Sequence, residues 1–146
     1  MKVFIASDHA GLAAKDELKQ ALNTEYELID LGPEELNPAD DYPIYAKKVA
    51  EAVSAEAGTR GILVCGSGQG MAIAANKFKG IRAAVVWDEE VARETRADND
   101  SNILSLPARF LTHVQAMHIT KTWLAAPFSN QERHQRRINE IKEFEV

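Results

Sequence analysis

The chain has 146 residues, of which 45% are hydrophobic and 27% charged, and its formal net charge is −5 at pH 7. A chain of this length buries roughly 68–70% of the surface that its unfolded form exposes, which is enough for one hydrophobic core without disulfides or metals. The acidic balance disfavours a nucleic-acid binder, because such proteins carry a clustered basic surface that releases counterions from phosphates. We therefore expect a single domain over residues 1–146 and no nucleic-acid partner.

Cysteine usage and the apolar runs indicate the compartment. The single cysteine, Cys65, cannot form an internal disulfide and has no second cysteine at zinc-ligand spacing, which favours a reducing compartment. Asp8 and His9 interrupt the apolar start of the chain, short of a signal peptide's ~7–15-residue apolar stretch. No apolar run approaches the ~18 residues of a membrane span. We expect a cytoplasmic protein that does not enter a membrane.

Short apolar runs alternate with segments of helical period along the chain. In chain order, the runs that predict β-strands are Val3–Ala6, Tyr26–Leu31, Gly61–Cys65, Ile81–Trp87 and Asn102–Leu106. Helices are predicted within the segments 14–22, 45–53, 71–76, 89–97, 114–124 and 130–145. The stretch 33–43, with its prolines and acidic residues, is predicted as a loop.

This alternation is typical of parallel strands joined by crossover helices. The predicted strands show little alternation of apolar and polar residues, which fits a sheet covered on both faces. The sequence predicts an α/β fold with a doubly wound, Rossmann-like, five-stranded parallel sheet and a C-terminal helix. Ligands in such folds bind outside the carboxyl ends of the strands. We therefore expect the chemistry at residues 7–9 after the first strand, at 65–68 after the third, and at 98–102, which enters the fifth.

The third predicted strand runs through three spaced glycines, Gly66, Gly68 and Gly70, into a helix. Glycines let backbone amides turn inward together, and the helix start adds partial positive charge, so this loop suits an anion or a developing oxyanion. A dinucleotide site is the alternative, because Asp88 ends the next strand at about the distance of a ribose-binding carboxylate. The G-x-G-x-G spacing, the place after the third strand and the short chain disfavour nicotinamide binding.

Cys65 lies at the strand end directly before this loop and allows two interpretations. It is either a buried small apolar side chain, as most free cysteines are, or a thiolate whose pKa the following amides lower. Ser67, two residues on, is either a turn residue or a hydroxyl that relays a proton. Sequence position alone does not separate these alternatives.

The polar segments at the other strand ends are equally ambiguous. Asp8 and His9 either form a polar turn in which Asp8 caps the following helix, or contact a ligand at a strand end. The segment 98–102, with Asp98 and Asn99, has the composition of a plain turn. Its carboxylates and amides could equally orient sugar hydroxyls.

Three arginines and a histidine stand together at residues 133–137 of an otherwise acidic chain. A charge run is usually a solvated helix face. Alternatively Arg133 and Arg137, four residues apart on one helical face, grip a phosphate with their forked guanidinium donors, and Arg109 joins them. His113 and His118 are interpreted as packing or surface residues.

Several short motifs together resemble ribose-5-phosphate isomerase of the B type, in the wider group that includes the galactose-6-phosphate isomerase subunits. They run in order over nearly the whole chain: Ser7–Gly11, Asp41–Pro43, Gly61–Gly68, Ala74–Lys77, Gly80–Ala83, Asn99–Asn102 and Arg133–Arg137. The resemblance implies an aldose–ketose isomerase that passes through a cis-enediolate without metal or organic cofactor, acting on a phosphorylated sugar.

Carried onto matching positions, the resemblance assigns roles to single residues. It makes Cys65 the base that moves the proton between C1 and C2, with Ser67 assisting. Backbone amides would stabilise the enediolate oxygen, as an oxyanion hole does, at Gly66, Gly68, Gln69 and Gly70. The phosphate ligands would be His9, Arg109, Arg133 and Arg137, while Asp8 and Asn99 would contact sugar hydroxyls.

The resemblance also implies a homodimer whose active sites draw residues from both subunits. One position departs from the family pattern: Asp98 stands where typical members have a histidine that opens the furanose ring. A carboxylic acid, with a reference pKa of about 3.9, is a poor acid near neutrality. Two alternatives to ribose 5-phosphate isomerisation therefore stay open: another substrate such as a hexose 6-phosphate, and a non-catalytic binder of sugar phosphates.

Overall fold

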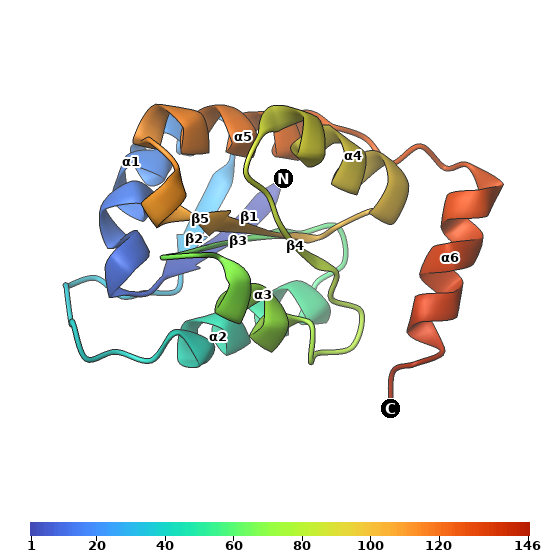
Figure 1. Ribbon diagram of the computed structural model, residues 1–146, viewed down its shortest axis with the longest axis horizontal. Helices are drawn as coiled ribbons and strands as arrows, with labels where there is room; N and C mark the ends of the chain where they lie inside the picture. The colour runs from blue at the N-terminus through green and yellow to red at the C-terminus, as the bar shows by residue number, and fades with distance from the viewer.

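One five-stranded sheet organises the computed structural model, which describes residues 1–146 (Figure 1). The strands are β1 (Lys2–Ser7), β2 (Glu27–Asp30), β3 (Arg60–Cys65), β4 (Ala83–Val85) and β5 (Ile103–Pro107). Their order across the sheet is β2-β1-β3-β5-β4, and all neighbouring strands are parallel. The predicted fold class and all five predicted strands are confirmed.

Helices connect and follow the strands where the periodicity predicts them. They are α1 (Leu12–Leu22), α2 (Tyr42–Ala55), α3 (Gln69–Ala75), α4 (Glu89–Asn99), α5 (His113–Ala125) and α6 (Glu132–Lys142), with two 3₁₀ turns, η1 (His9–Gly11) and η2 (Ala108–Phe110). The predicted loop is confirmed up to Asp41, after which α2 begins with Pro43 in its first turn. No helix is long and apolar enough to span a membrane.

Two hydrophobic cores cover the two faces of the sheet. Figure 1 shows α1, α4 and α5 on one face and α2 and α3 on the other. Along β1, Val3 and Ile5 point into the core with α1, α4 and α5, whereas Phe4 and Ala6 point into the core with α2 and α3. Successive strand residues face opposite sides, so both sets must be apolar, which explains the weak alternation in the sequence.

The register of the sheet brings three strand ends to one edge. Ser7 at the end of β1 pairs with Val64, and Cys65 at the end of β3 pairs with Pro107 at the end of β5. The segments that follow, η1, the Gly66–Gly70 loop and η2, therefore emerge side by side. Both 3₁₀ turns contact β3 and each other.

The C-terminal helix α6 stands apart from these layers. Figure 1 shows it beyond β4, the edge strand, on the side of the sheet from which β5 starts. Only His134 and Ile138 of α6 are buried, while Ile141 and Phe144 at its end are exposed. A cavity of about 620 Å³ separates this end from the β4 region. The chain thus leaves the inner face of α6 only partly covered.

Candidate active site

The loop after β3 wraps its amides around the Cys65 sulfur. The amide of Gly68 donates a hydrogen bond to Cys65 Sγ at 3.2 Å. Gly68 has φ 74° and lies so close to β5 that a Cβ would stand 3.2 Å from the Leu106 carbonyl carbon and the Pro107 nitrogen. Its carbonyl also accepts from the buried Ser105 hydroxyl at 2.6 Å. Only glycine meets both demands at this position, so the loop is fixed by β5.

The Cys65 side chain is buried, and this burial affects the pKa of its thiol. The residue is 4% exposed and belongs to the core beneath α2 and α3. Burial, with a smaller contribution from the negative charge of Asp8, raises the pKa of the thiol, although the amides of Gly68, Met71 and Ser67 oppose the shift. Burial therefore favours the thiol over the thiolate, and the role of Cys65 as a base stays a prediction.

The start of α3 is open on one side and covered on the other. Ser67 is exposed, and its hydroxyl accepts a hydrogen bond from the amide of Gln69 at 3.3 Å, which is the turn role that its position allows. Tyr42, the first residue of α2, lies over Gly70 so closely that a Cβ there would stand 2.5 Å from the tyrosine ring. Tyr42 therefore forms one wall of the loop.

Asp8 and His9 follow β1 and lie beside this loop. The Asp8 side chain is nearly buried and accepts from the amide of Gly11 at 3.1 Å, so the capping interpretation is confirmed. His9 is half-buried, and its Nδ1 lies 2.6 Å from Oδ1 of Asp40. Sequence analysis missed Asp40, because no local pattern links a loop carboxylate to a histidine 31 residues earlier.

Arg109 completes the cluster from η2. Its amide donates to the Gly66 carbonyl at 3.0 Å, and its guanidinium lies about where a side chain at Gly66 would stand, 2.9 Å from an added Cβ. Arg109 is exposed, so its charge faces the open side of the loop. The carboxyl edge of the sheet therefore gathers Asp8, His9, Cys65, the Gly66–Gly70 amides and Arg109.

A second group of predicted residues lies elsewhere. Asp98 and Asn99 form the exposed end of α4, and Arg133 and Arg137 are exposed on α6. Asp98 Oδ1 lies 3.4 Å from Nε2 of His134, a buried residue of α6. Arg133 is hydrogen-bonded to Gln131. These contacts join the end of α4 to α6 into one polar surface.

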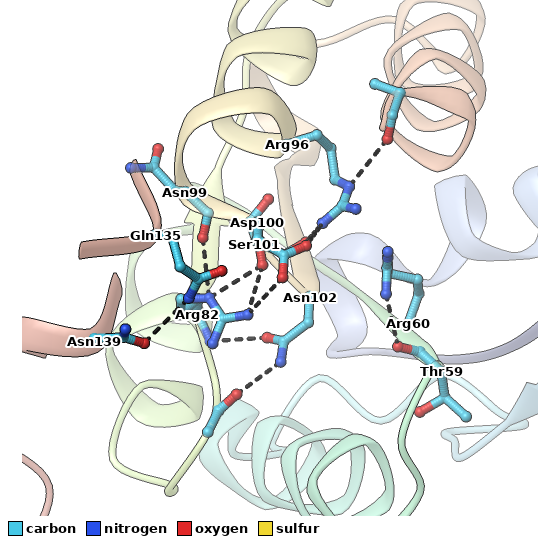
Figure 2. A network of polar contacts seen from close by, with 12 residues as sticks. Thr59, Arg60, Arg82, Arg96, Asn99, Asp100, Ser101, Asn102, Gln135 and Asn139 are labelled. Carbon is cyan, nitrogen blue, oxygen red and sulfur yellow. Dashed lines mark hydrogen bonds and ion pairs between the residues drawn. The ribbon is translucent and has the colours of Figure 1, made fainter. Parts of the chain in front are cut away.

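Two arginines hold the end of α4 in place (Figure 2). Asp100 ends the helix with φ 47°, and its carboxylate accepts from Arg96 at 2.7 Å and from Arg82 at 3.2 Å. Arg82 Nε also donates to the carbonyls of Asn99 and Asp100 at 3.0 and 3.1 Å. The position of Asn99 is thus set by Arg82, which precedes β4, as well as by the helix itself.

One chain does not bring the two groups together. The segment 98–102 precedes β5 and lies at its amino end, whereas Arg109 and the Cys65 loop lie at the carboxyl end. The five residues of β5 separate them by roughly 16 Å at ~3.3 Å per residue. The expectation that this segment shares the site at the carboxyl edge is wrong within a single chain, because the residues before a parallel strand start from the opposite edge.

Comparison with known proteins gives one consistent result. A model of the Ribose/Galactose Isomerase family matches residues 3–141. The solved ribose-5-phosphate isomerase B from Mycoplasma genitalium, with bound ribulose-5-phosphate, is 41% identical with a TM-score of 0.95, covering 98% of this chain and 95% of that one. The enzyme of that name from Clostridium thermocellum is 46% identical with a TM-score of 0.92, covering 98% and 96%.

A curated relative agrees with these structures. Ribose-5-phosphate isomerase B of Mycobacterium tuberculosis is 36% identical over 146 residues, which are 99% of this chain and 90% of that protein. The resemblance seen in the motifs is confirmed along nearly the full length. This chain belongs to the ribose/galactose isomerase family.

Proposed function

We propose that the chain interconverts ribose 5-phosphate and ribulose 5-phosphate, with Cys65 as the base. The observation that carries the proposal is the Cys65 sulfur, held by the Gly68 amide at 3.2 Å, inside a loop of amides flanked by His9 and Arg109. Aldose–ketose isomerisation is the chemistry of the family, and a relative of 41% identity has ribulose-5-phosphate bound.

The proposed reaction moves one proton between neighbouring carbons. The Cys65 thiolate removes the proton from C2 of the open-chain aldose, the C–H electrons form a C1–C2 double bond, and the carbonyl electrons move to O1. The amides of Gly66, Gly68, Gln69 and Gly70 stabilise the oxygen that becomes negative. Ser67 relays the proton from O2 to O1, and Cys65 returns its proton to C1, which gives the ketose.

The phosphate and the sugar hydroxyls take the remaining predicted residues. Arg109 supplies positive charge and the His9 ring a hydrogen-bond donor at the carboxyl edge, and Asp8 has one carboxylate oxygen beyond its capping bond to contact a hydroxyl. Forked guanidinium donors suit a phosphate dianion better than any other side chain. Arg133, Arg137 and Asn99 fulfil their proposed roles only if another copy of the chain supplies them.

We propose a homodimer for that reason. A two-fold axis makes each contact twice, so the α6 surface of one subunit meets the Cys65 loop of its partner and the reverse. Two features support this arrangement: α6 leaves apolar side chains uncovered, and Ile73 on α3 and Trp87 after β4 are exposed large apolar residues. Because the proposed base is a free thiol, we also place the activity in the cytoplasm.

Because Asp98 replaces the ring-opening histidine, the experiment must also test two alternatives to ribose 5-phosphate isomerisation. A carboxylate is a poor proton donor near neutrality, so a substrate that needs no furanose opening, such as a hexose 6-phosphate, or binding without turnover, would each explain the residue. The experiment incubates purified protein, without added cofactor, with a panel of pentose and hexose phosphates and detects ketose formation. Asp98→His runs alongside and is expected to speed ring opening.

Each outcome of the panel has one meaning. Turnover of ribose 5-phosphate that Cys65→Ala abolishes, with the fold intact, supports the proposal. Full activity in Cys65→Ala would show that Cys65 is not the base. Turnover restricted to a hexose 6-phosphate would make that sugar the substrate. Tight binding with no turnover of any sugar would identify a non-catalytic binder.

A further inference from the structure

A carboxylate outside every recognised motif lies against His9. Oδ1 of Asp40 stands 2.6 Å from His9 Nδ1 and accepts the His9 backbone amide at 3.2 Å. The Asp40 side chain is only 4% exposed, whereas His9 is 34% exposed. One oxygen atom therefore holds both the main chain and the ring of the histidine from the buried side.

The chemistry of this contact fixes which ring nitrogen remains for a ligand. An ionised carboxylate only accepts hydrogen bonds, so the hydrogen between Asp40 and the ring belongs to Nδ1. Nε2 is then the one ring nitrogen that Asp40 does not engage. It donates to a phosphate oxygen only when the ring is protonated, because the neutral Nδ1–H ring leaves a lone pair on Nε2. A ring held in this way has one orientation, so less side-chain entropy is lost when a ligand binds.

The loop that carries Asp40 is itself anchored to the sheet. The Gly32 carbonyl accepts from the Ser7 amide at 3.1 Å, and the Pro33 carbonyl accepts from Nζ of Lys15 at 2.6 Å. Lys15 is fully buried on α1. The start of the loop that leads to Asp40 is thus bonded to β1 and α1.

Loop closure alone does not account for the buried charge. The second oxygen of Asp40, Oδ2, is buried and forms no hydrogen bond of normal geometry, which costs free energy that an apolar residue would avoid. The Tyr45 hydroxyl lies near enough to interact with Asp40, and burial, the Asp40 charge and this polar contact raise the pKa of Tyr45. The other charged groups at this edge are Asp8 and Arg109. Both hydrogen bonds that the Asp40 side chain forms go to His9, so its charge acts first on that residue.

We propose that Asp40 is a positioning residue that fixes the His9 ring through Nδ1, stabilises its protonated form and presents the Nε2–H to the phosphate of the substrate. This inference rests on the proposed function, which places His9 at the phosphate. Asp40 touches no substrate atom in this role and acts through His9.

The experiment compares Asp40→Ala and Asp40→Asn with a matched control. Charge-assisted hydrogen bonds are about twice as strong as neutral ones, so we expect Asp40→Ala to raise KM for ribose 5-phosphate roughly tenfold or more. Asp40→Asn, which keeps an acceptor of the same size, is expected to raise KM roughly threefold to tenfold, while kcat changes less than about twofold in both. The control is Glu35→Gln, which removes an exposed charge from the same loop and is expected to keep the wild-type KM.

A second measurement does not depend on turnover. In the ring ¹⁵N spectrum of His9 we expect the wild-type protein to carry a hydrogen on Nδ1, and to carry one on Nε2 as well once inorganic phosphate is bound. Asp40→Ala is expected to lose the Nδ1 hydrogen and to show the neutral Nε2–H tautomer. Binding of inorganic phosphate is expected to weaken in Asp40→Ala by about the same factor as KM. If Asp40→Ala does not fold, Asp40→Asn carries both measurements, since the amide keeps the shape of the side chain.

The results separate this inference from the proposed function. Absence of ribose 5-phosphate turnover in the wild type overturns the function, whatever Asp40 does. An active wild type in which both Asp40 variants keep KM within about twofold, or in which His9 carries no hydrogen on Nδ1, overturns the positioning role. An equal KM rise in Glu35→Gln overturns it as well, because loop charge alone would then explain the effect.

Discussion

Cys65 combines two demands that oppose each other at the scale of one residue. Its sulfur must be buried to lie among the loop amides, and burial raises its pKa from the ordinary 9.0. The same amides that would stabilise an enediolate oxygen also lower the pKa of the thiol, but they do not outweigh its desolvation. The enzyme therefore holds its proposed base mostly as the inactive thiol near neutral pH.

The rate should accordingly rise with pH. The active base is the thiolate, whose fraction falls about tenfold for each pH unit below the pKa, so kcat/KM is expected to climb steadily from about pH 7 towards 9 and beyond. Starting above pH 7 avoids the second ionisation of the substrate phosphate near about pH 6. The measurement is the pH profile of kcat/KM, and a plateau reached before about pH 8 would contradict the raised pKa.

At the scale of elements, β2 and α1 are joined by a buried ion pair. Lys15, fully buried, and Lys19 both donate to the carboxylate of Asp30, at 2.9 and 2.6 Å. Burial opposes ionisation of Asp30, but hydrogen bonds from Lys19, Gly32 and Lys15 prevail and lower its pKa below 3.8. The pair also holds the start of the loop that leads to Asp40.

Removing Asp30 should leave a buried cation without its partner. Breaking a buried pair from one side costs about 3–5 kcal/mol, and since Asp30 is 19% exposed we expect Asp30→Ala to lose about 3 kcal/mol of unfolding free energy. The measurement is urea denaturation at neutral pH. Glu56→Ala, which removes the surface partner of Lys2, is the control and should leave the unfolding free energy nearly unchanged.

The lowered pKa of Asp30 determines how the unfolding free energy changes at acid pH. Asp30 contributes its stability fully above the carboxyl's unfolded pKa, and the contribution is lost as pH falls below 3.8 through the folded value. Asp30→Ala should therefore lose less stability than the wild type over that acid range. Equal losses in the two proteins would contradict the ion pair's role.

The end of α4 depends on backbone conformation and charge together. Asp100 adopts φ 47° and pairs with Arg82 and Arg96. Both Asp100→Gly and Asp100→Ala remove the carboxylate, but glycine adopts a positive φ without strain and alanine does not. We therefore expect the alanine variant to be about 1 kcal/mol less stable than the glycine variant. Thermal unfolding of the two variants tests this, and equal midpoints would mean that the left-handed turn relaxes.

At the scale of the whole molecule, local sequence patterns predict the helices and strands well, but they predict poorly the contacts between residues far apart in the chain. The sequence predicts the strand that ends at Cys65 and the glycine loop after it, because residues adjacent in sequence build both. The bond between His9 and Asp40 spans 31 residues, and the pKa of Cys65 depends on core residues from several elements, so neither follows from a local pattern. The place of Asp98 at the amino edge already follows from the predicted parallel sheet, because residues that enter a strand lie at the edge opposite to residues that leave it.

The separation of the two residue groups predicts how two damaged chains behave together. Cys65→Ala loses the proposed base and Arg137→Ala loses a proposed phosphate ligand of the partner's site, so each variant alone should be nearly inactive. In a mixed dimer, the Cys65 of one chain meets the Arg137 of the other, which restores one of two sites.

Refolding the two variants together in equal amounts should make half of the dimers mixed, which restores about a quarter of the wild-type activity. The control mixes Cys65→Ala with Ser67→Ala: both residues lie in the same loop, so every site keeps a defect and activity should stay low. A first mixture that recovers nothing, or a wild-type chain that sediments as a fully active monomer at assay concentration, would contradict the shared site. Recovery in the first mixture alone assigns Cys65 and Arg137 to one site built from two chains.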